Sequence, residues 1–347
     1  MNLLLISVHS KQSRGGIATW TDRFLSNCEK HEINCTLVNT ETIGKRREKG
    51  TAKRNFFDEI IRTRRIFSDL KTALKSATYD AAHLNTSCGT FGLFRDLILA
   101  KRIKKKGLRL ITHFHCDVPY WIHNPISRRC LGKLVALSDE NLVLCENSRA
   151  YLEKSFGVTS HKVPNFLDDD LIREDGKQIS QKIEKAFFVG RVSEAKGAKE
   201  LYELAKLFEN IEFRLVGDVS PTVAEWERPS NVTLVGQLPH SDVLAEMDRA
   251  DVFVFPSHSE GFSLALTEAM ARGLPAITTD VGAAGDMLSD GCGIVVALGD
   301  VEAMASALRS LEDAHERETI SRRAAQKVRE QYATDVILEA FKKYYLI

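Results

Sequence analysis

The chain has 347 residues, of which 27% are charged and 44% apolar, and its formal net charge at pH 7 is +1. That length allows two domains with substantial cores, and the composition excludes the fibrous and disordered classes of protein. No stretch approaches the ~18 apolar residues of a membrane span, and the opening MNLLLISVHS lacks the basic start and cleavage site of a signal peptide, so it predicts a strand.

Short apolar runs alternate with helical patterns along the first half of the chain. Strands are predicted at 2–8, 34–39, 79–85, 108–114 and 141–145, and helices at about 17–28, 56–76 and 91–106. This alternation is typical of a parallel α/β sheet.

The same alternation restarts after a polar stretch that ends near residue 185. Strands are predicted at 186–190, 212–217, 232–236, 251–256, 275–279 and 293–297, with helices that begin near 197, 241 and 263 and fill the end from about 301. We therefore predict an α/β protein of two doubly wound, Rossmann-like domains that face a central cleft. The expected division is a first domain at 1–165, a linker at 166–185, a second domain at 186–330, and a C-terminal helix at 331–347 that packs back toward the first domain.

Two glutamates accompany the apolar helix expected within 256–286. Glu260 is predicted to begin this helix, and Glu268 follows eight positions later. On one helix their carboxylates would lie within about 80° of each other and about 12 Å apart along the axis. That separation suits two ends of one extended ligand. The alternative is an acid favoured by the helix dipole and an exposed helix residue, which leaves the apolar surroundings of Glu268 unexplained.

Arg191 and Lys196 lie in a predicted strand-to-helix loop. Cations in such a loop can clamp a phosphate at the carboxyl ends of parallel strands, and the alternative is a solvated loop. Gly15 and Gly16 likewise connect the first strand to a helix, which lets backbone N–H groups approach an anion. Without the full GxGxxG spacing, a plain tight turn is the alternative.

Three further groups have weaker signals for chemistry. His113 and His115 follow a strand, but no additional cluster has zinc-ligand spacing, so a packed or surface role is expected for them. Asp168, Asp169 and Asp170 formally match an aspartate-x-aspartate metal site, but they stand in the predicted linker. The seven cysteines form an odd set without a CxxC pair, which predicts reduced thiols in a cytosolic protein.

Taken together, these segments resemble family 4 of the retaining GT-B glycosyltransferases over nearly the whole chain. The most specific match is EGFSLALTEAMARGLPAIT, which contains the family's E-x7-E module. Further matches, in the family's order, are GGI, PNF followed by Asp168, VGR…KG and VGQLPHSDVLAEMDRADVFVFPS. Two departures are EGFS where the family often has EGFG, and GAAGD in place of GG-x-x-E, which leaves the role of Asp286 open.

The resemblance implies an enzyme that binds a UDP- or GDP-sugar mainly through its second domain. Arg191 and Lys196 would neutralise the donor diphosphate, with help from Gly16 and from the backbone amides at Ser263 and Leu264. A glycan or polyprenyl-linked acceptor would bind mainly to the first domain.

The resemblance also assigns the ends of the donor. Glu268 would accept hydrogen bonds from the ribose hydroxyls, and Glu260 would contact the donor sugar. His115 would reach the donor sugar and the reacting centre from the first domain. Leu238, within 236–239, would line the base pocket, largely through backbone.

The implied reaction retains the anomeric configuration and needs neither a protein-bound metal nor a cofactor besides the donor. Fixed cations would stabilise the leaving diphosphate. The setting implied is polysaccharide biosynthesis, without a nucleic-acid partner. One alternative is a nucleotide-sugar epimerase on the same scaffold, which would need no acceptor. Another is a non-enzymatic, two-lobed binding protein, which would bind sugar without turnover.

Charge divides unevenly between the halves. Residues 1–165 contain 28 Lys and Arg against 15 Asp and Glu, a balance of +13, whereas 166–347 contain 20 against 32, a balance of −12. Basic runs are either solvated surface or a means of attraction to an anionic membrane or acceptor. The second reading predicts peripheral attachment at the cytoplasmic face of a membrane. The residues expected to take part are Lys101, Arg102, Lys104, Lys105 and Lys106, with Arg62, Arg64 and Arg65.

Overall fold

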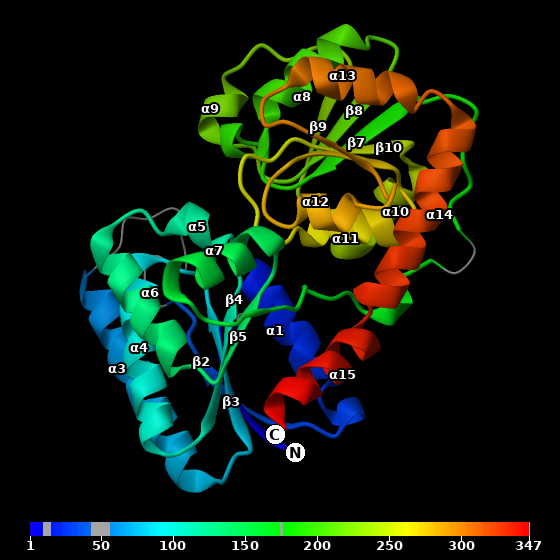
Figure 1. Cartoon of the computed structure of the whole chain (residues 1–347). Coiled ribbons are helices and arrows are strands. Elements are labelled where there is room, and N and C mark those ends of the chain that lie inside the picture. Colours follow the sequence, from blue (N-terminus) through cyan, green and yellow to red (C-terminus); the bar gives the residue numbers. More distant parts are fainter. Residues whose placement is uncertain (10–14, 43–55, 174–175, 347) are drawn as a thin grey trace. The chain divides into compact units, whose positions relative to one another are not determined.

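The computed structural model describes residues 1–9, 15–42, 56–173 and 176–346. It divides into two compact units, one formed by Met1–Asn165 with Thr334–Ile347 and the other by Phe166–Ala333. Each unit contains one six-stranded parallel sheet, which confirms the predicted pair of doubly wound α/β domains (Figure 1). The basic run at 44–55 lies outside the described residues. Within the described ranges, no helix combines the length and the apolarity that crossing a bilayer requires.

The sheet of the first unit has the strand order β2-β1-β3-β4-β5-β6. Its strands are β1 (Asn2–Ser7), β2 (Asn34–Asn39), β3 (Ala81–Thr86), β4 (Arg109–Phe114), β5 (Glu140–Val143) and β6 (His161–Lys162). The first five match predicted strands, and the two-residue β6 was not predicted. The winding reverses between β1 and β3, because the chain goes from β1 to β2 on one side and returns to β3 on the other.

Helices cover both faces of this sheet. They are α1 (Gly16–Asn27), the 3-10 turn η1 (Glu29–His31), α3 (Phe56–Ser76), α4 (Thr90–Lys105), α5 (Val118–Trp121), α6 (Pro125–Leu137), α7 (Glu146–Phe156) and α15 (Thr334–Tyr345). The predicted helices 17–28, 56–76 and 91–106 correspond to α1, α3 and α4. The helices α3, α4 and α6 lie side by side in Figure 1, and α4 contacts both α3 and α6.

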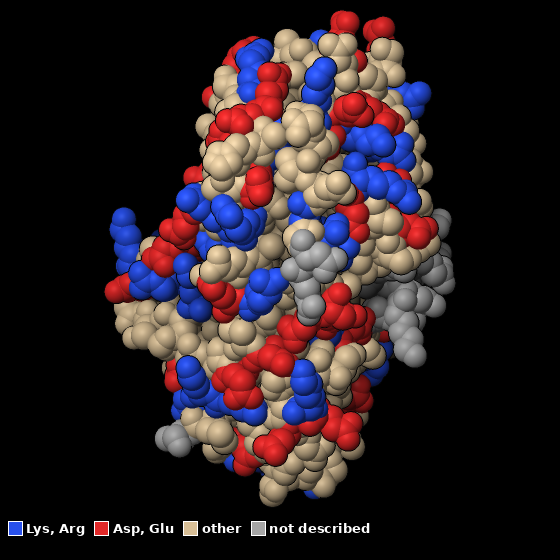
Figure 2. Space-filling view, turned by 90° about the vertical axis from the view of Figure 1, so that its right-hand side faces the viewer, with Lys and Arg blue, Asp and Glu red and all other residues tan. Residues whose placement is uncertain are grey.

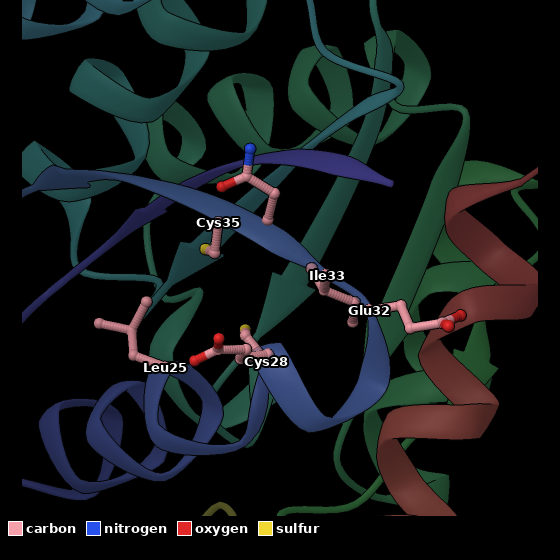
Figure 3. A pocket seen from close by; sticks show the side chains of 7 residues that line it. Leu25, Cys28, Glu32, Ile33 and Cys35 are labelled. Atoms are coloured by element: carbon pink, nitrogen blue, oxygen red, sulfur yellow. The ribbon is translucent and has the colours of Figure 1, made fainter.

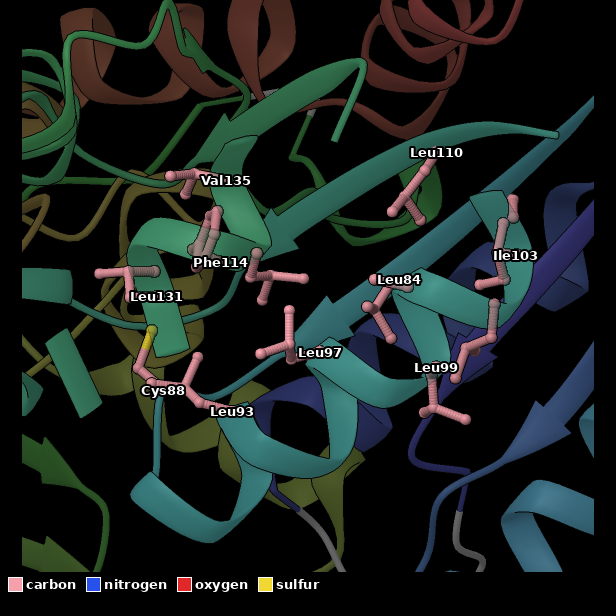
Figure 4. Packing of buried hydrophobic residues seen from close by; sticks show 14 of the residues in the cluster. Leu84, Cys88, Leu93, Leu97, Leu99, Ile103, Leu110, Phe114, Leu131 and Val135 are labelled. Carbon is pink, nitrogen blue, oxygen red and sulfur yellow. The ribbon is translucent and has the colours of Figure 1, made fainter. Parts of the chain in front are cut away.

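Alternation along β3 and β4 separates two buried layers. Leu84 and Phe114 point into an apolar core with Leu97 of α4 and Leu131 of α6 (Figure 4). The neighbouring side chains, such as His113, point to the opposite face, as the pleat of a strand requires. The α3–α4–α6 layer therefore packs on one face of the sheet.

The opposite face is covered by α1 and the C-terminal helix α15. Trp20 stacks on Phe24 with ring centroids 4.8 Å apart, and Phe341 meets Trp20 edge-on at 5.8 Å. The hydroxyl of Tyr345 lies 2.6 Å from Nδ1 of His83. At the rim, Nε2 of His31 lies 3.0 Å from Asp335, so the end of the chain is held by polar and apolar contacts together.

Three histidines, His83, His113 and His115, form a cluster beneath α1. The ring centroids of His113 and His115 are 4.1 Å apart, and those of His83 and His113 are 5.4 Å apart. Burial lowers the pKa of His113 to about 3. Burial, reinforced by the neighbouring His113, also lowers the pKa of His83 and of His115 well below the usual value. All three rings are therefore neutral at pH 7.

The sheet of the second unit has the order β12-β11-β10-β7-β8-β9, and its six strands match the predicted ones. They are β7 (Lys185–Val189), β8 (Glu212–Val216), β9 (Val232–Gly236), β10 (Val252–Phe255), β11 (Ala276–Thr279) and β12 (Ile294–Val296). Its helical elements are η2 (Asp169–Leu171), η3 (Glu194–Lys196), α8 (Ala198–Leu207), α9 (Pro221–Ala224), α10 (His240–Arg249), α11 (Leu264–Ala271), α12 (Ala284–Leu288), α13 (Val301–Ser310) and α14 (Ala314–Gln331).

We expect the stability of the first unit to fall as the pH drops below about 6.5. A histidine buried in its neutral form has a native pKa below its unfolded value of about 6.5, so its contribution is present above that pH and is lost on acidification. For His113 the loss continues down to the native value of about 3. Between the unfolded and native pKa values, each such histidine lowers the unfolding free energy by about 1.4 kcal/mol per pH unit of acidification.

Urea unfolding at pH 7.5, 6.5 and 5.5 measures this loss. His113→Gln removes one titrating ring, so its unfolding free energy should depend less steeply on pH than that of the wild type, by about 1.4 kcal/mol per unit below pH 6. Parallel pH dependences in the two proteins would contradict the assignment of His113 as a buried neutral ring.

Candidate active site

The predicted donor residues of the second unit follow two neighbouring strands. The chain leaves β7 toward β8 and β9, then returns to β10 on the other side of β7, so the winding reverses between β7 and β10. In open parallel sheets, ligands bind outside the carboxyl ends of strands at such a reversal. Arg191 and Lys196 follow β7, and Glu260 follows β10. The topology therefore directs the predicted clamp and one predicted sugar ligand to a common edge.

Two glycines allow the loops at this edge to approach closely. Gly197 has φ +78°, and a Cβ there would lie 2.2 Å from the carbonyl oxygen of Pro256. Gly282 has φ +57°, and a Cβ there would lie 2.2 Å from the carbonyl oxygen of Glu260. A side chain would clash with backbone at both positions. The loops after β7, β10 and β11 are thus packed backbone to backbone.

This packing brings Lys196 and Glu260 into an ion pair. Nζ of Lys196 lies 2.5 Å from Oε1 of Glu260 and 3.4 Å from the carbonyl oxygen of Ser259. The buried Ser257 donates its hydroxyl to the same Oε1 at 3.1 Å. The side chains of the pair remain 30% and 18% exposed, so both groups are accessible to a ligand.

Arg191 lies on the same loop as Lys196 but is exposed. No hydrogen bond or ion pair of its guanidinium to another described residue is found. A guanidinium offers five N–H donors in a planar fork that fits a phosphate in bidentate fashion. Arg191 is therefore available for an anion, whereas Lys196 would have to exchange its carboxylate partner.

Glu260 is not on the helix, so the prediction that it begins α11 is wrong. The helix begins at Leu264, after Ser263 accepts a hydrogen bond on its side chain from the amide of Leu266 at 3.2 Å. A serine in extended conformation is a strong N-cap and ends the preceding loop at that point. The estimate of about 80° and about 12 Å for the two glutamates therefore does not apply.

Glu268 lies on α11 and is buried, with 8% of the residue exposed. Its Oε1 is 3.1 Å from Nε2 of His240. An exposed helix residue was the alternative reading of Glu268, and its burial excludes it. His240 was missed by sequence reasoning, although its place at the start of a helix after Leu238 and Pro239 could have drawn attention to it.

The second unit also offers backbone groups to a ligand, at the start of α11 and in the segment 236–239. The first amides of α11, including that of Leu264, have no carbonyl partner within the helix, as at every helix start, and can bind an anion. The segment 236–239, which includes Leu238, connects β9 to α10 and thus leads directly into His240. Gln237 in this segment donates to Asp218 at 2.6 Å.

The first unit contains the two other predicted residues, Gly16 and His115. Gly16 begins α1 and is exposed, and a Cβ there would meet no other part of the described chain within 4 Å. His115 directly follows β4, and its amide donates to the carbonyl of Thr86 at 2.8 Å. Both ring nitrogens of His115 are buried without a hydrogen-bond partner among the described residues. The ring contacts Trp20 edge-on at a centroid distance of 5.1 Å.

Residues considered for other roles lie elsewhere. Asp169 and Asp170 begin η2, and no group of three or more His, Cys, Asp or Glu side chains suited to a metal is found among the described residues. Asp286 lies in α12, where its carbonyl oxygen accepts from Lys327 at 2.7 Å. All seven cysteines are free.

A pocket of about 520 Å³ opens beside the carboxyl end of α1, between that helix and β2 (Figure 3). Leu25, Cys28, Ile33 and Cys35 are among the residues that line it. None of the predicted donor residues takes part. It lies at the opposite end of α1 from Gly16, so we do not assign the donor to it.

Comparison with known proteins gives consistent matches. Residues 172–328 match the family model of the glycosyl transferases group 1. The chain is 27% identical over 313 residues to the capsular polysaccharide biosynthesis glycosyltransferase CapM of Staphylococcus aureus, covering 81% of each protein. Sucrose-phosphate synthase from Thermosynechococcus elongatus superposes with a TM-score of 0.80 at 18% identity, covering 99% of this chain and 98% of the other. HepE of Anabaena, solved in complex with UDP, gives 0.74 at 16% identity, covering 99% of both chains.

Gly197→Ala should destabilise the second unit far more than an alanine at a glycine with the same backbone conformation and open surroundings. Gly299 is such a control, because its φ is +75° and nothing lies within 4 Å of a Cβ. Both variants incur the left-handed strain of about 1 kcal/mol. Gly197→Ala should cost about 1–3 kcal/mol more, because its Cβ meets backbone. Equal losses of unfolding free energy in urea would show that the loops are not closely packed.

Proposed function

We propose that the chain transfers a sugar from a UDP- or GDP-sugar to a glycan or polyprenyl-linked acceptor. The premise is that it belongs to the family of group 1 glycosyl transferases and is a glycosyltransferase of the GT-B fold. The transfer retains the anomeric configuration and serves the synthesis of a surface polysaccharide. The observation that best supports this function is the Lys196–Glu260 pair at the edge where β7 and β10 end.

In this proposal the pair exchanges partners when the donor binds. A diphosphate carries more negative charge than the single carboxylate of Glu260, and it would compete for the ammonium of Lys196. Glu260 would then be free to accept hydrogen bonds from the hydroxyls of the donor sugar. Lys196 would thereby contact the leaving diphosphate, and Glu260 would contact the sugar.

In this proposal the protein promotes the reaction by stabilising the negative charge of the leaving diphosphate. As the bond between the sugar and the diphosphate breaks, negative charge grows on the phosphate and positive charge on the anomeric carbon. Arg191 and Lys196 would stabilise the former, together with the amides at the start of α11 near Ser263 and Leu264. Fixed donors of this kind are worth about 2.7–4 kcal/mol each in well-studied sites. We assign no covalent step to Glu260.

Glu268 and the segment around Leu238 would bind the nucleoside. A buried carboxylate with a ring nitrogen of His240 at 3.1 Å has a fixed position, which suits recognition of the two ribose hydroxyls. His240 would orient this carboxylate. Backbone at 236–239 would meet the base, and UDP is the nucleotide to test first because the HepE structure contains it.

The first unit would contribute Gly16 and His115. The exposed start of α1 at Gly16 would offer amides to the diphosphate. The neutral ring of His115 would donate or accept a hydrogen bond at the donor sugar. The acceptor would bind to this unit.

A screen of nucleotide-sugars tests the proposal. A donor at 100 times its Kd should raise the unfolding free energy by about 2.7 kcal/mol, which is read as a rise in Tm. The same donor, incubated with lipid-linked and soluble glycan acceptors, should lose its sugar to one of them. Chelator should leave this transfer largely intact, because protein cations balance the diphosphate. Interconversion of the free nucleotide-sugar without transfer would overturn the proposal, as would activity that chelator abolishes and a divalent ion restores.

The two glutamates should fail differently when changed to glutamine. Glu268→Gln should weaken binding of the nucleoside diphosphate by about 1–3 kcal/mol, because a buried hydrogen-bond partner of the ribose is altered. Glu260→Gln should leave that affinity unchanged or tighter, because Lys196 loses its competing carboxylate, while the transfer rate falls. Calorimetry with UDP and initial rates measure the two effects.

Glu203→Gln on the exposed surface of α8 is the matched control and should change neither quantity. Lys196→Ala should weaken diphosphate binding in the wild type and in the Glu260→Gln background alike. An equal loss of nucleoside diphosphate affinity in both glutamate variants would show that our division of their roles is wrong.

A further inference from the structure

The outer layer of the first unit combines bulky apolar and basic side chains in a repeated order. Each of α3, α4 and α6 begins with exposed large apolar residues: Phe57 and Ile61 on α3, Phe91 and Phe94 on α4, and Ile126 on α6, each 57–72% exposed. Exposed side chains of this size are unusual in such density on a surface that meets water.

Basic residues continue the same outward stripes toward the ends of the helices. Residues three, four or seven apart share a helix face, and this spacing connects the apolar starts to all of the exposed cations except Arg128. The exposed cations are Arg64, Lys71 and Lys75 on α3, Lys101, Arg102 and Lys105 on α4, and Arg128, Arg129 and Lys133 on α6. No ion pair of these nine with a carboxylate is found among the described residues. Asp69 is the one fully exposed acid in the described parts of these helices.

A groove of about 480 Å³ lies between the carboxyl ends of α3 and α4. Leu70 and Leu74 give it an apolar wall, and the cations around it are Lys71, Lys75, Arg102, Lys105 and Lys106. The guanidinium of Arg102 lies over the ring of Phe67 at 4.1 Å, which fixes one of these charges. We call this feature the basic groove. It fits a ligand with an anionic head and an apolar body.

Other basic residues of the sequence hypothesis are used within the protein. Arg62 is buried and donates to Glu59 and to the carbonyl of Thr40. Arg65 donates to the carbonyl of Glu41 at 3.0 Å, and Lys104 pairs with Asp139 at 2.6 Å. These three side chains already have partners within the first unit, and the remaining cations define a narrower surface.

The layer differs from the side that Figure 2 turns toward the viewer, where acidic and basic side chains lie intermixed in each unit. A soluble polyanion would need cations but no exposed phenylalanine. An apolar protein partner would not need nine cations that have no carboxylate partner among the described residues. A bilayer with anionic lipids offers both features at once, with phosphates at its surface and acyl chains beneath. We propose that the exposed face of α3, α4 and α6 is a docking surface for a bilayer that contains anionic phospholipids.

In this arrangement Ile61, Phe94 and Ile126 enter the boundary between headgroups and acyl chains, and the basic groove takes a lipid phosphate. Each basic side chain near an anionic surface strengthens attachment by about fivefold, so several together give firm but reversible binding. Added salt weakens the electrostatic part, because screening shortens to about 3 Å at 1 M. The apolar part remains.

Sedimentation with phosphatidylcholine vesicles, with and without phosphatidylglycerol, tests the proposal on the full chain. The wild type should pellet with phosphatidylglycerol vesicles at low salt and stay in solution with phosphatidylcholine alone. The variant K71Q/K75Q/R102Q/K105Q should bind the anionic vesicles about 100-fold more weakly or worse at low salt. The variant I61S/F94S should bind about tenfold more weakly or worse at both salt concentrations.

Matched substitutions in the second unit, K206Q/R249Q and L207S, change exposed residues of the same types and should leave vesicle binding unchanged. The Tm rise with UDP should persist in all these variants, so a failure of docking is distinguishable from a failure of the proposed function. Equal binding to neutral and anionic vesicles, or wild-type binding by the groove variant, would overturn the proposal. If inorganic phosphate, added at constant ionic strength, released the protein from the vesicles, the groove would be a site for a soluble anion. That result would also overturn the proposal.

Discussion

The close approach of Gly197 to the carbonyl of Pro256 is the constraint on which the proposed donor site depends. It connects the loop after β7 to the loop after β10, two strands that lie side by side because the winding reverses there. Lys196 precedes this contact directly, and Glu260 follows Pro256 by four residues. A bulkier residue at 197 would separate the loops, and the 2.5 Å ion pair would be lost with them. A steric requirement of the backbone thus sets an electrostatic distance.

The partial exposure of that ion pair is compatible with the proposed exchange of partners. A fully buried pair would incur a large desolvation cost and would be held firmly by its surroundings. At 30% and 18% exposure, Lys196 and Glu260 retain some solvation, so exchange of the carboxylate for a diphosphate involves a smaller reorganisation. Glu268 is different, because burial and His240 hold it in one place. In the proposed function, the fixed carboxylate of Glu268 would recognise the nucleoside, and the exchangeable carboxylate of Glu260 would contact the sugar.

The sequence predicted the sheets well because parallel strands buried on both faces appear as short apolar runs. It also predicted which loop holds Arg191 and Lys196, since both follow a strand end. It took Glu260 as the first residue of the helix although a helix start near 263 was also predicted, and the N-cap that decides the boundary is a local hydrogen bond of Ser263. His240 was missed, since its meaning depends on a contact with Glu268, 28 residues away. The partners of Arg62 and Lys104 were not predicted for the same reason, because charge counts do not show which carboxylates or carbonyls lie nearby.

The two faces of the first sheet are covered by different helices. One face is covered by the C-terminal helix α15, which places Phe341 and Tyr345 against aromatic rings of α1 and β3. A hydrogen bond between His31 and Asp335 holds the rim of this helix. The other face is covered by α3, α4 and α6, whose inner sides form the apolar core of Figure 4. Their outer sides have no further layer within the described chain, yet they carry large apolar groups and unpaired cations. Because water is a poor environment for the apolar groups and mutual repulsion disfavours the clustered charges, an anionic bilayer is the surrounding that satisfies both.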